Sequence, residues 1–206
     1  MFRTRTLALG RTLALGLCVL VACASKQGTE LRDVKSPPPP ATVPATWDFA
    51  DASMLPRHQG AAMAACEWLL SYAPATSDSK SWVRTRDFAL DWIEATPSIV
   101  VTQPIVAYVA TDRRFMYGVY MRGAYQCGKA SWVLAHPGGD ALSFEAELAG
   151  INAMRQLMGA LQDWDPHTGS RRLDRLGRAE QRGKLEAKLT KIIAKNKGGG
   201  GRKKRR

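Results

Sequence analysis

The sequence is short of residues that bind metals. Only three histidines occur in 206 residues, at positions 58, 136 and 167. They lie on separate segments, and none belongs to a His-Glu-x-x-His pair, so no metal site is encoded locally. A site at His167 would need Asp163 and Asp165 beside it, and we interpret that segment as a loop where a helix ends before Pro166. We therefore predict no metal and no cofactor.

Familiar catalytic motifs are also missing. The chain has no Gly-x-Ser-x-Gly elbow and no phosphate-binding loop ending in Gly-Lys-Ser/Thr. Glu145 and Glu147 could form a pair of carboxylates, but residues two apart on a helix point to different faces. We expect both to be solvated. The six tryptophans are expected in the core and not along a ligand groove. No catalytic residue is predicted, and a small hydrolase with an unrecognised site remains an alternative.

An apolar run near the N-terminus, Thr12 to Ala22, is shorter than the roughly 20 residues that a membrane-spanning helix needs. It follows a segment with three arginines and no acid, residues 1–11. A basic stretch followed by a short apolar stretch is typical of a secretory signal. We therefore expect residues 1–22 to be a signal peptide.

The signal ends in Leu20-Val21-Ala22-Cys23, which resembles the lipobox of bacterial lipoproteins. The resemblance implies that Cys23 becomes the first mature residue and is acylated on its sulfur. Ala24-Ser25 lacks the Asp associated with inner-membrane retention, so the resemblance also implies an outer membrane lipoprotein on the periplasmic face. The alternative is ordinary cleavage after Ala24, which would give a soluble periplasmic or secreted protein.

Cysteine is scarce, with four in the chain. Cys18 leaves with the signal and Cys23 is the expected lipid attachment site. Only Cys66 and Cys127 remain for the folded domain. In an oxidising compartment two such cysteines are a candidate disulfide, and two buried free thiols are the alternative.

Patterns typical of β-strands are nearly absent. Ile99–Val101 is the only plausible strand, and one β-branched triplet followed at once by Gln103-Pro104 does not make a sheet. Helical periodicity instead predicts five helices, at residues 57–72, 79–95, 112–129, 140–161 (with Asp140 as cap) and 171–195. The fold class is therefore all-α, a small bundle of about five helices packed as helix pairs. Gly123 and Ala124 among aromatic residues indicate a close helix approach.

The expected organisation has five parts. After the signal comes a Pro-rich tether over residues 23–46, with extended polyproline at Pro37–Pro40. A helical domain at 47–165, a basic C-terminal helix at 166–197 and a disordered Gly/basic tail at 198–206 follow. The aromatic and small residues around Tyr117–Cys127, with the Lys184–Lys188 segment, resemble uncharacterised secreted helical proteins of bacterial envelopes. That resemblance implies a fold type without an activity.

Negative charge is scarce at the C-terminal end. The whole chain carries a net charge of +12, but residues 46–165 alone are net negative and the last 41 residues hold 15 bases against three acids. The candidate anion-binding residues are Arg171, Arg172, Arg175, Arg178, Arg182, Lys184, Lys188, Arg202, Lys203, Lys204, Arg205 and Arg206. The alternative is a solvated charge run that only keeps the chain soluble.

An exported chain makes nucleic acid an unlikely partner, and it meets other anions: phospholipid headgroups, lipopolysaccharide phosphates or acidic cell-wall polymers. Our first hypothesis is a membrane-anchored, non-enzymatic helical adaptor or scaffold with an envelope protein partner. The second is a binder of anionic envelope polymers or lipids through the basic helix and tail.

Overall fold

The computed structural model describes residues 37–74, 79–112 and 115–197. Cys23, the expected signal peptide and the tail at 198–206 lie outside the described residues. Within the described ranges the chain is helical and has no strand, which confirms the all-α class. The elements are η1 (Ala52–Met54), α1 (Leu55–Ser71), α2 (Ser79–Ala95), α3 (Gln103–Ala110), α4 (Gly118–Ala135), α5 (Phe144–Trp164), α6 (Arg171–Gln181) and α7 (Leu185–Lys197).

Two helices match the sequence pattern closely, and one was missed. α2 has the predicted bounds and α1 begins two residues earlier than predicted. The missed helix is α3, because Pro104 looked like an interruption. Pro104 lies in the first turn of α3, where a backbone N–H has no intrahelical partner and proline is tolerated.

The ends of α4 and α5 also differ from the prediction. α4 begins at Gly118 and continues past Lys129 to Ala135, and the turn at His136-Pro-Gly-Gly follows it. Gly138 has a φ of +79° in this turn. α5 is capped by Ser143, whose hydroxyl accepts from the N–H of Ala146, while Asp140 accepts from the N–H of Leu142 within the preceding turn.

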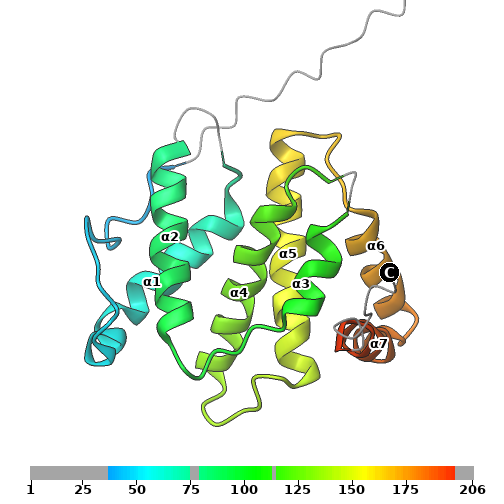
Figure 1. Ribbon diagram of the computed structural model, residues 1–206. Helices are drawn as coiled ribbons and strands as arrows, with labels where there is room; N and C mark the ends of the chain where they lie inside the picture. Colours follow the sequence, from blue (N-terminus) through cyan, green and yellow to red (C-terminus); the bar gives the residue numbers. More distant parts are fainter. Residues whose placement is uncertain (1–36, 75–78, 113–114, 198–206) are drawn as a thin grey trace, which may run out of the picture.

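α4 is the central helix of the fold (Figure 1). It contacts α1, α2, α3 and α5, and its most extensive packing is against α5. A Cβ on Gly128 would lie 2.5 Å from the carbonyl oxygen of Ala149, and one on Gly150 would lie 2.5 Å from the Tyr125 ring. The close approach therefore occurs at these two glycines. At the predicted position, Gly123, a Cβ would meet Leu90 at an ordinary 3.7 Å.

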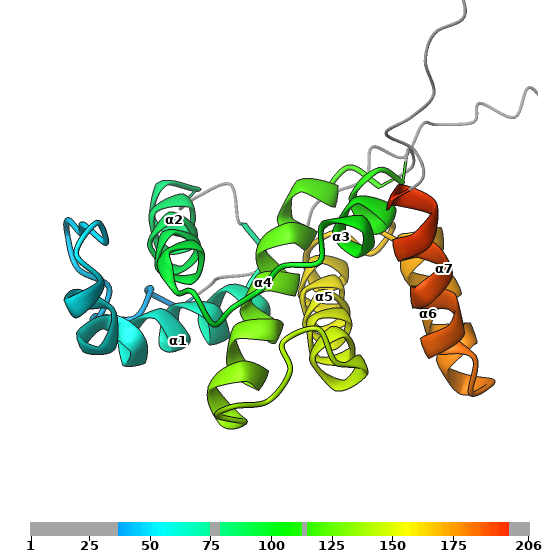
Figure 2. The ribbon, with the colours of Figure 1, turned by 60° about the horizontal axis from the view of Figure 1, so that its bottom comes forward.

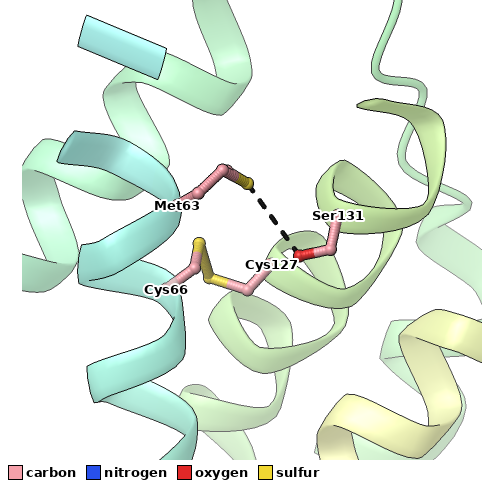
Figure 3. The surroundings of a disulfide bond; sticks show 4 residues. All are labelled: Met63, Cys66, Cys127 and Ser131. Atoms are coloured by element: carbon pink, nitrogen blue, oxygen red, sulfur yellow. Dashed lines mark hydrogen bonds between the residues drawn. A yellow bond between two sulfur atoms is a disulfide. The ribbon is translucent and has the colours of Figure 1, made fainter. Parts of the chain in front are cut away.

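A disulfide joins α1 to α4. Cys66 and Cys127 are bonded with a Cα–Cα distance of 5.3 Å, and both are buried. The predicted bridge is confirmed. Figure 3 shows it crossing between the two helices beside Met63 and Ser131, whose hydroxyl lies 3.9 Å from the Met63 sulfur. The bond closes a loop that contains α2 and α3.

The last part of the predicted tether packs on the domain. The indole N–H of Trp68 donates to the carbonyl of Pro37 at 3.2 Å, and Arg84 donates to the carbonyl of Pro44 at 2.6 Å. Val43 packs against the core. The predicted tether at 23–46 is therefore too long at its C-terminal end, and residues 37–46 belong to the domain.

The six tryptophans pack in or against the hydrophobic core. Trp68, Trp82, Trp92 and Trp164 are buried, and Trp47 and Trp132 pack half-buried against the core. Trp92 donates from its indole to the carbonyl of Leu55 at 2.8 Å, which fixes α2 against the start of α1. This confirms the prediction that the tryptophans belong to the core.

Candidate functional site

The predicted basic C-terminal helix is two helices. α6 ends at Gln181, and Gly183 follows with a φ of +64°. The N–H of Lys184 donates to the carbonyl of Ala179 and that of Gly183 to the carbonyl of Glu180, both at 2.8 Å. This pair of bonds around a left-handed glycine is a Schellman motif, which ends α6 and lets α7 turn back. The result is a helical hairpin at one end of the molecule (Figures 1 and 2).

A basic groove lies between the two helices of the hairpin. Its volume is about 380 Å³, and its lining consists only of basic residues and alanines. We call it the α6–α7 groove and define it by Arg175, Arg178, Ala179, Arg182, Lys184, Ala187, Lys188 and Lys191. The arginines come from the α6 side and the lysines from the α7 side. Their spacings of three or four residues put each set on one helix face.

The six cations of the groove have no carboxylate to neutralise them. None of them forms an ion pair with any residue in the described part of the chain. Among the acids of the hairpin, Glu180 pairs with Arg155 of α5 at 2.5 Å, while Asp174 and Glu186 lie outside the groove lining. The groove therefore concentrates uncompensated positive charge, which favours anions.

The hairpin is fixed to the rest of the domain through Asp112, at the end of α3. The Asp112 carboxylate accepts from the hydroxyl of Ser170 and from the backbone N–H of Arg172, each at 3.1 Å. Arg172 in turn donates to the carbonyl of Tyr108 and the hydroxyl of Thr111, each at 2.7 Å, and its guanidinium lies over the Tyr108 ring. Buried leucines of both helices complete the attachment, so the groove is held rigidly.

The structure brings together five of the predicted anion-binding residues. Arg175, Arg178, Arg182, Lys184 and Lys188 meet in the groove, joined by Lys191, which was not among the candidates. Its spacing of three residues from Lys188 places it on the same face of α7, and that signal could have found it.

The remaining candidates lie elsewhere. Arg172 is engaged inside the domain, so it is not part of an open site. Arg171 is exposed and does not line the groove. Residues 202–206 lie outside the described residues.

A second group of polar side chains is buried where α3, α4 and α5 meet. Glu147 of α5 accepts from Lys129 at 2.8 Å and from the hydroxyls of Thr102 and Tyr125. Lys129 is fully buried, and its Nζ also lies 3.3 Å from the Thr102 hydroxyl. The expectation that Glu147 is solvated was wrong. Its carboxylate faces α4, where the ammonium and hydroxyl groups compensate its burial.

Tyr125 acts as a donor in this group. Burial, together with the negative charge of Glu147, raises the pKa of the Tyr125 hydroxyl far above its ordinary value. The phenol therefore keeps its proton and donates it to the carboxylate. Because Lys129, Tyr125 and Glu147 are all buried, we assign this group to fixing α4 against α5 and not to chemistry on a substrate.

Two of the histidines, on separate elements, take part in ring packing. The ring of His58 on α1 meets Phe49 edge-on at 5.5 Å, and that of His136 stacks on Trp132 at 4.5 Å. Beside His167, Asp165 accepts from the Tyr117 hydroxyl and from the His167 backbone N–H. In the described ranges, no three His, Cys, Asp or Glu side chains gather as a metal site would require.

Two further observations concern the class of protein. No helix among the described residues is both long and apolar enough to cross a bilayer. No protein family, curated protein or solved structure that we compared with the chain matches it. The function is therefore argued from the geometry and the sequence of this chain alone.

Proposed function

We propose that the chain is an envelope lipoprotein, attached to the outer membrane through Cys23, that acts as a non-enzymatic adaptor for anionic envelope ligands. One end of the adaptor is the lipid. The other is the α6–α7 groove, which holds the anion. The observation that supports this best is the convergence of six unpaired cations in one groove without a lining carboxylate.

The lipid anchor is supported by the sequence. The lipobox-like Leu20-Val21-Ala22-Cys23 follows a basic segment and a short apolar run, as a lipoprotein signal requires. The Cys66–Cys127 bridge is consistent with export, because disulfides persist in oxidising compartments.

The adaptor role is supported by where the cations lie. A solvated charge run would spread its basic residues around a helix. Here a turn at Gly183 folds the run back so that two sets of cations face one groove. Facing cations repel one another, and this arrangement becomes favourable when an anion lies between them.

Charge reversal in the groove tests this function. The groove variant is Arg178→Glu/Lys188→Glu, and the matched control is Arg171→Glu/Lys195→Glu, on the same helices but outside the groove lining. Both change the net charge equally. The probes are inorganic polyphosphate and vesicles containing phosphatidylglycerol, added to the mature chain in a neutral detergent and followed by calorimetry or flotation.

The groove variant should bind at least one probe about thirty-fold more weakly than the control. This follows from about 1 kcal/mol for each of two lost cations near an anionic ligand. Circular dichroism of both variants checks that the fold is intact. Equal binding by the two variants to every probe would remove the groove from the function.

A further inference from the structure

Resting on the proposed function, a narrower inference concerns the shape of the anion. Arg175 and Arg178 lie on α6 and Arg182 directly follows it, so this row covers seven residue steps. Lys184 directly precedes α7 and Lys188 and Lys191 lie on it, so the second row also covers seven steps. Seven residues of helix are about 10 Å long. Both far ends, Arg175 and Lys191, line the same groove, so the two rows face each other along its length.

The number of cations exceeds what one phosphate group can neutralise. A phosphate group carries at most about two charges near neutral pH, while the groove presents six cations. The groove volume of about 380 Å³ is also more than ten times the roughly 30 Å³ that one water occupies in the liquid. Full use of the groove therefore requires several anionic groups joined in a row.

The floor and the donors indicate which chemistry would fit. Ala179 and Ala187 are the only uncharged lining residues, and their small side chains leave the space between the rows open. The planar guanidinium fork of each arginine matches the oxygens of phosphate in pairs, and lysine adds a mobile point charge. Six charges along about 10 Å demand an anion with closely spaced charges, which a chain of phosphates supplies.

Two alternatives fit the groove less well. A nucleic acid strand would expose bases that are held by stacking on aromatic side chains, and no aromatic residue lines the groove. A flat bilayer surface presents headgroups to an exposed face and does not follow a concave groove between two helices.

We propose that the α6–α7 groove binds a linear chain of phosphate groups, lying along the two rows of cations.

The test compares phosphate compounds of increasing length. Orthophosphate, triphosphate and a polyphosphate of fifteen units are titrated into the full mature chain in neutral detergent over a salt series. Polyglutamate of similar charge, a single-stranded oligonucleotide and phosphatidylglycerol vesicles are measured in parallel. The groove and control variants described above isolate the part of binding that depends on the groove. A chain ending at Lys197 lacks the basic tail, so it separates binding by the groove from binding by the tail.

We expect groove-dependent affinity to rise at least a hundredfold from orthophosphate to the fifteen-unit chain. The logarithm of the binding constant should fall with the logarithm of salt with a slope of about −4 to −5, since six cations release counterions at roughly 0.7 to 0.9 per contact. In the groove variant, the magnitude of that slope should be smaller by about two. The chain ending at Lys197 should keep the groove-dependent part.

Three results would overturn the inference while leaving the proposed function in place. In the first, the groove-dependent affinity is equal for orthophosphate and the fifteen-unit chain. In the second, polyglutamate or the oligonucleotide binds the groove more strongly than the fifteen-unit chain does. In the third, only the vesicles show groove-dependent binding. Loss of any difference between the groove and control variants for every probe would contradict the proposed function itself.

Discussion

Glycines set the distance between the two helices that pack most closely. Gly128 of α4 lies against the backbone of α5 at Ala149, and Gly150 of α5 lies against the Tyr125 ring of α4. Each helix therefore supplies a glycine where the other comes near. Close packing of this kind cannot absorb an added methyl group without a shift of backbone or ring.

Gly128→Ala should destabilise the domain. The new Cβ would lie 2.5 Å from the Ala149 oxygen and 2.6 Å from the Ala153 Cβ, so α4 and α5 must separate. We expect a loss of about 1–3 kcal/mol in urea unfolding with the disulfide intact. The control is Gly159→Ala on α5, which meets nothing within 4 Å and should gain about 0.5–1 kcal/mol from helix propensity. Equal stability of the two variants would contradict this packing.

Lys129→Met should lower the free energy of unfolding more than the double variant Lys129→Met/Glu147→Leu does. The single change leaves a buried carboxylate without its ammonium partner, at a cost of about 3–5 kcal/mol. The double variant Lys129→Met/Glu147→Leu removes both charges and should recover most of that loss. Chemical denaturation of the three proteins measures it. A single variant as stable as the wild type would show that the pair is not buried together.

For single residues, the sequence predicted the disulfide and missed the buried ion pair. The pairing of Cys66 with Cys127 was predictable because only these two cysteines remain once Cys18 is assigned to the predicted signal and Cys23 to the predicted lipid attachment. Lys129 and Glu147 were not, because a charged residue on a helix is normally solvated. Their burial depends on partners 18 positions apart in the sequence that meet only when α4 packs on α5.

Proline and glycine decide where the helical elements divide. Pro104 begins α3, and Gly183 separates α6 from α7. In the sequence, Pro104 was taken as an interruption and residues 171–195 were predicted as one helix. Proline disrupts a helix in its interior and is tolerated in its first turn, so the outcome depends on where the helix starts. The left-handed conformation of Gly183 is common directly after a helix, so this glycine marks the end of α6.

Gly183→Ala should weaken the hairpin and its groove together. A φ of +64° is unfavourable for alanine by roughly 1–2 kcal/mol, so the Schellman turn loses stability. Hydrogen exchange should show faster opening of α6 and α7, with α1, α2 and α4 unchanged. Gly177→Ala, in the interior of α6 with a negative φ, is the control and should slow opening slightly. Faster exchange spread over the whole domain would contradict a local role for Gly183.

Replacing both Cys66 and Cys127 with alanine should destabilise the domain without changing its fold class. The bridge closes a loop with a sequence separation of 61. On the chain-entropy model such a loop accounts for about 4 kcal/mol. Urea unfolding of the variant, compared with that of the oxidised wild type, measures the difference. Unchanged stability would mean that the bridge does not constrain the unfolded chain.

On the scale of the whole molecule, charge is divided between two regions. The helical body from 46 to 165 is net negative, and six of the 15 basic residues of the C-terminal end line the groove of the hairpin. Composition alone predicted that anions would bind at this end. It could not predict that α6 and α7 face each other, since that follows from one turn and from the contacts of Asp112 and Arg172 with the hairpin.

The proposed adaptor binds its anionic ligand in the α6–α7 groove, so it also needs an anchor, which is the lipid proposed at Cys23. The decisive measurement is the intact mass of the mature chain from a membrane fraction, for the wild type and for Cys23→Ala. We expect a chain that starts at Cys23 and carries a lipid-sized mass increment, with the increment lost and the protein released from the membrane in the variant. An unmodified wild-type chain that starts at Ser25 would contradict the anchor and leave a soluble exported protein.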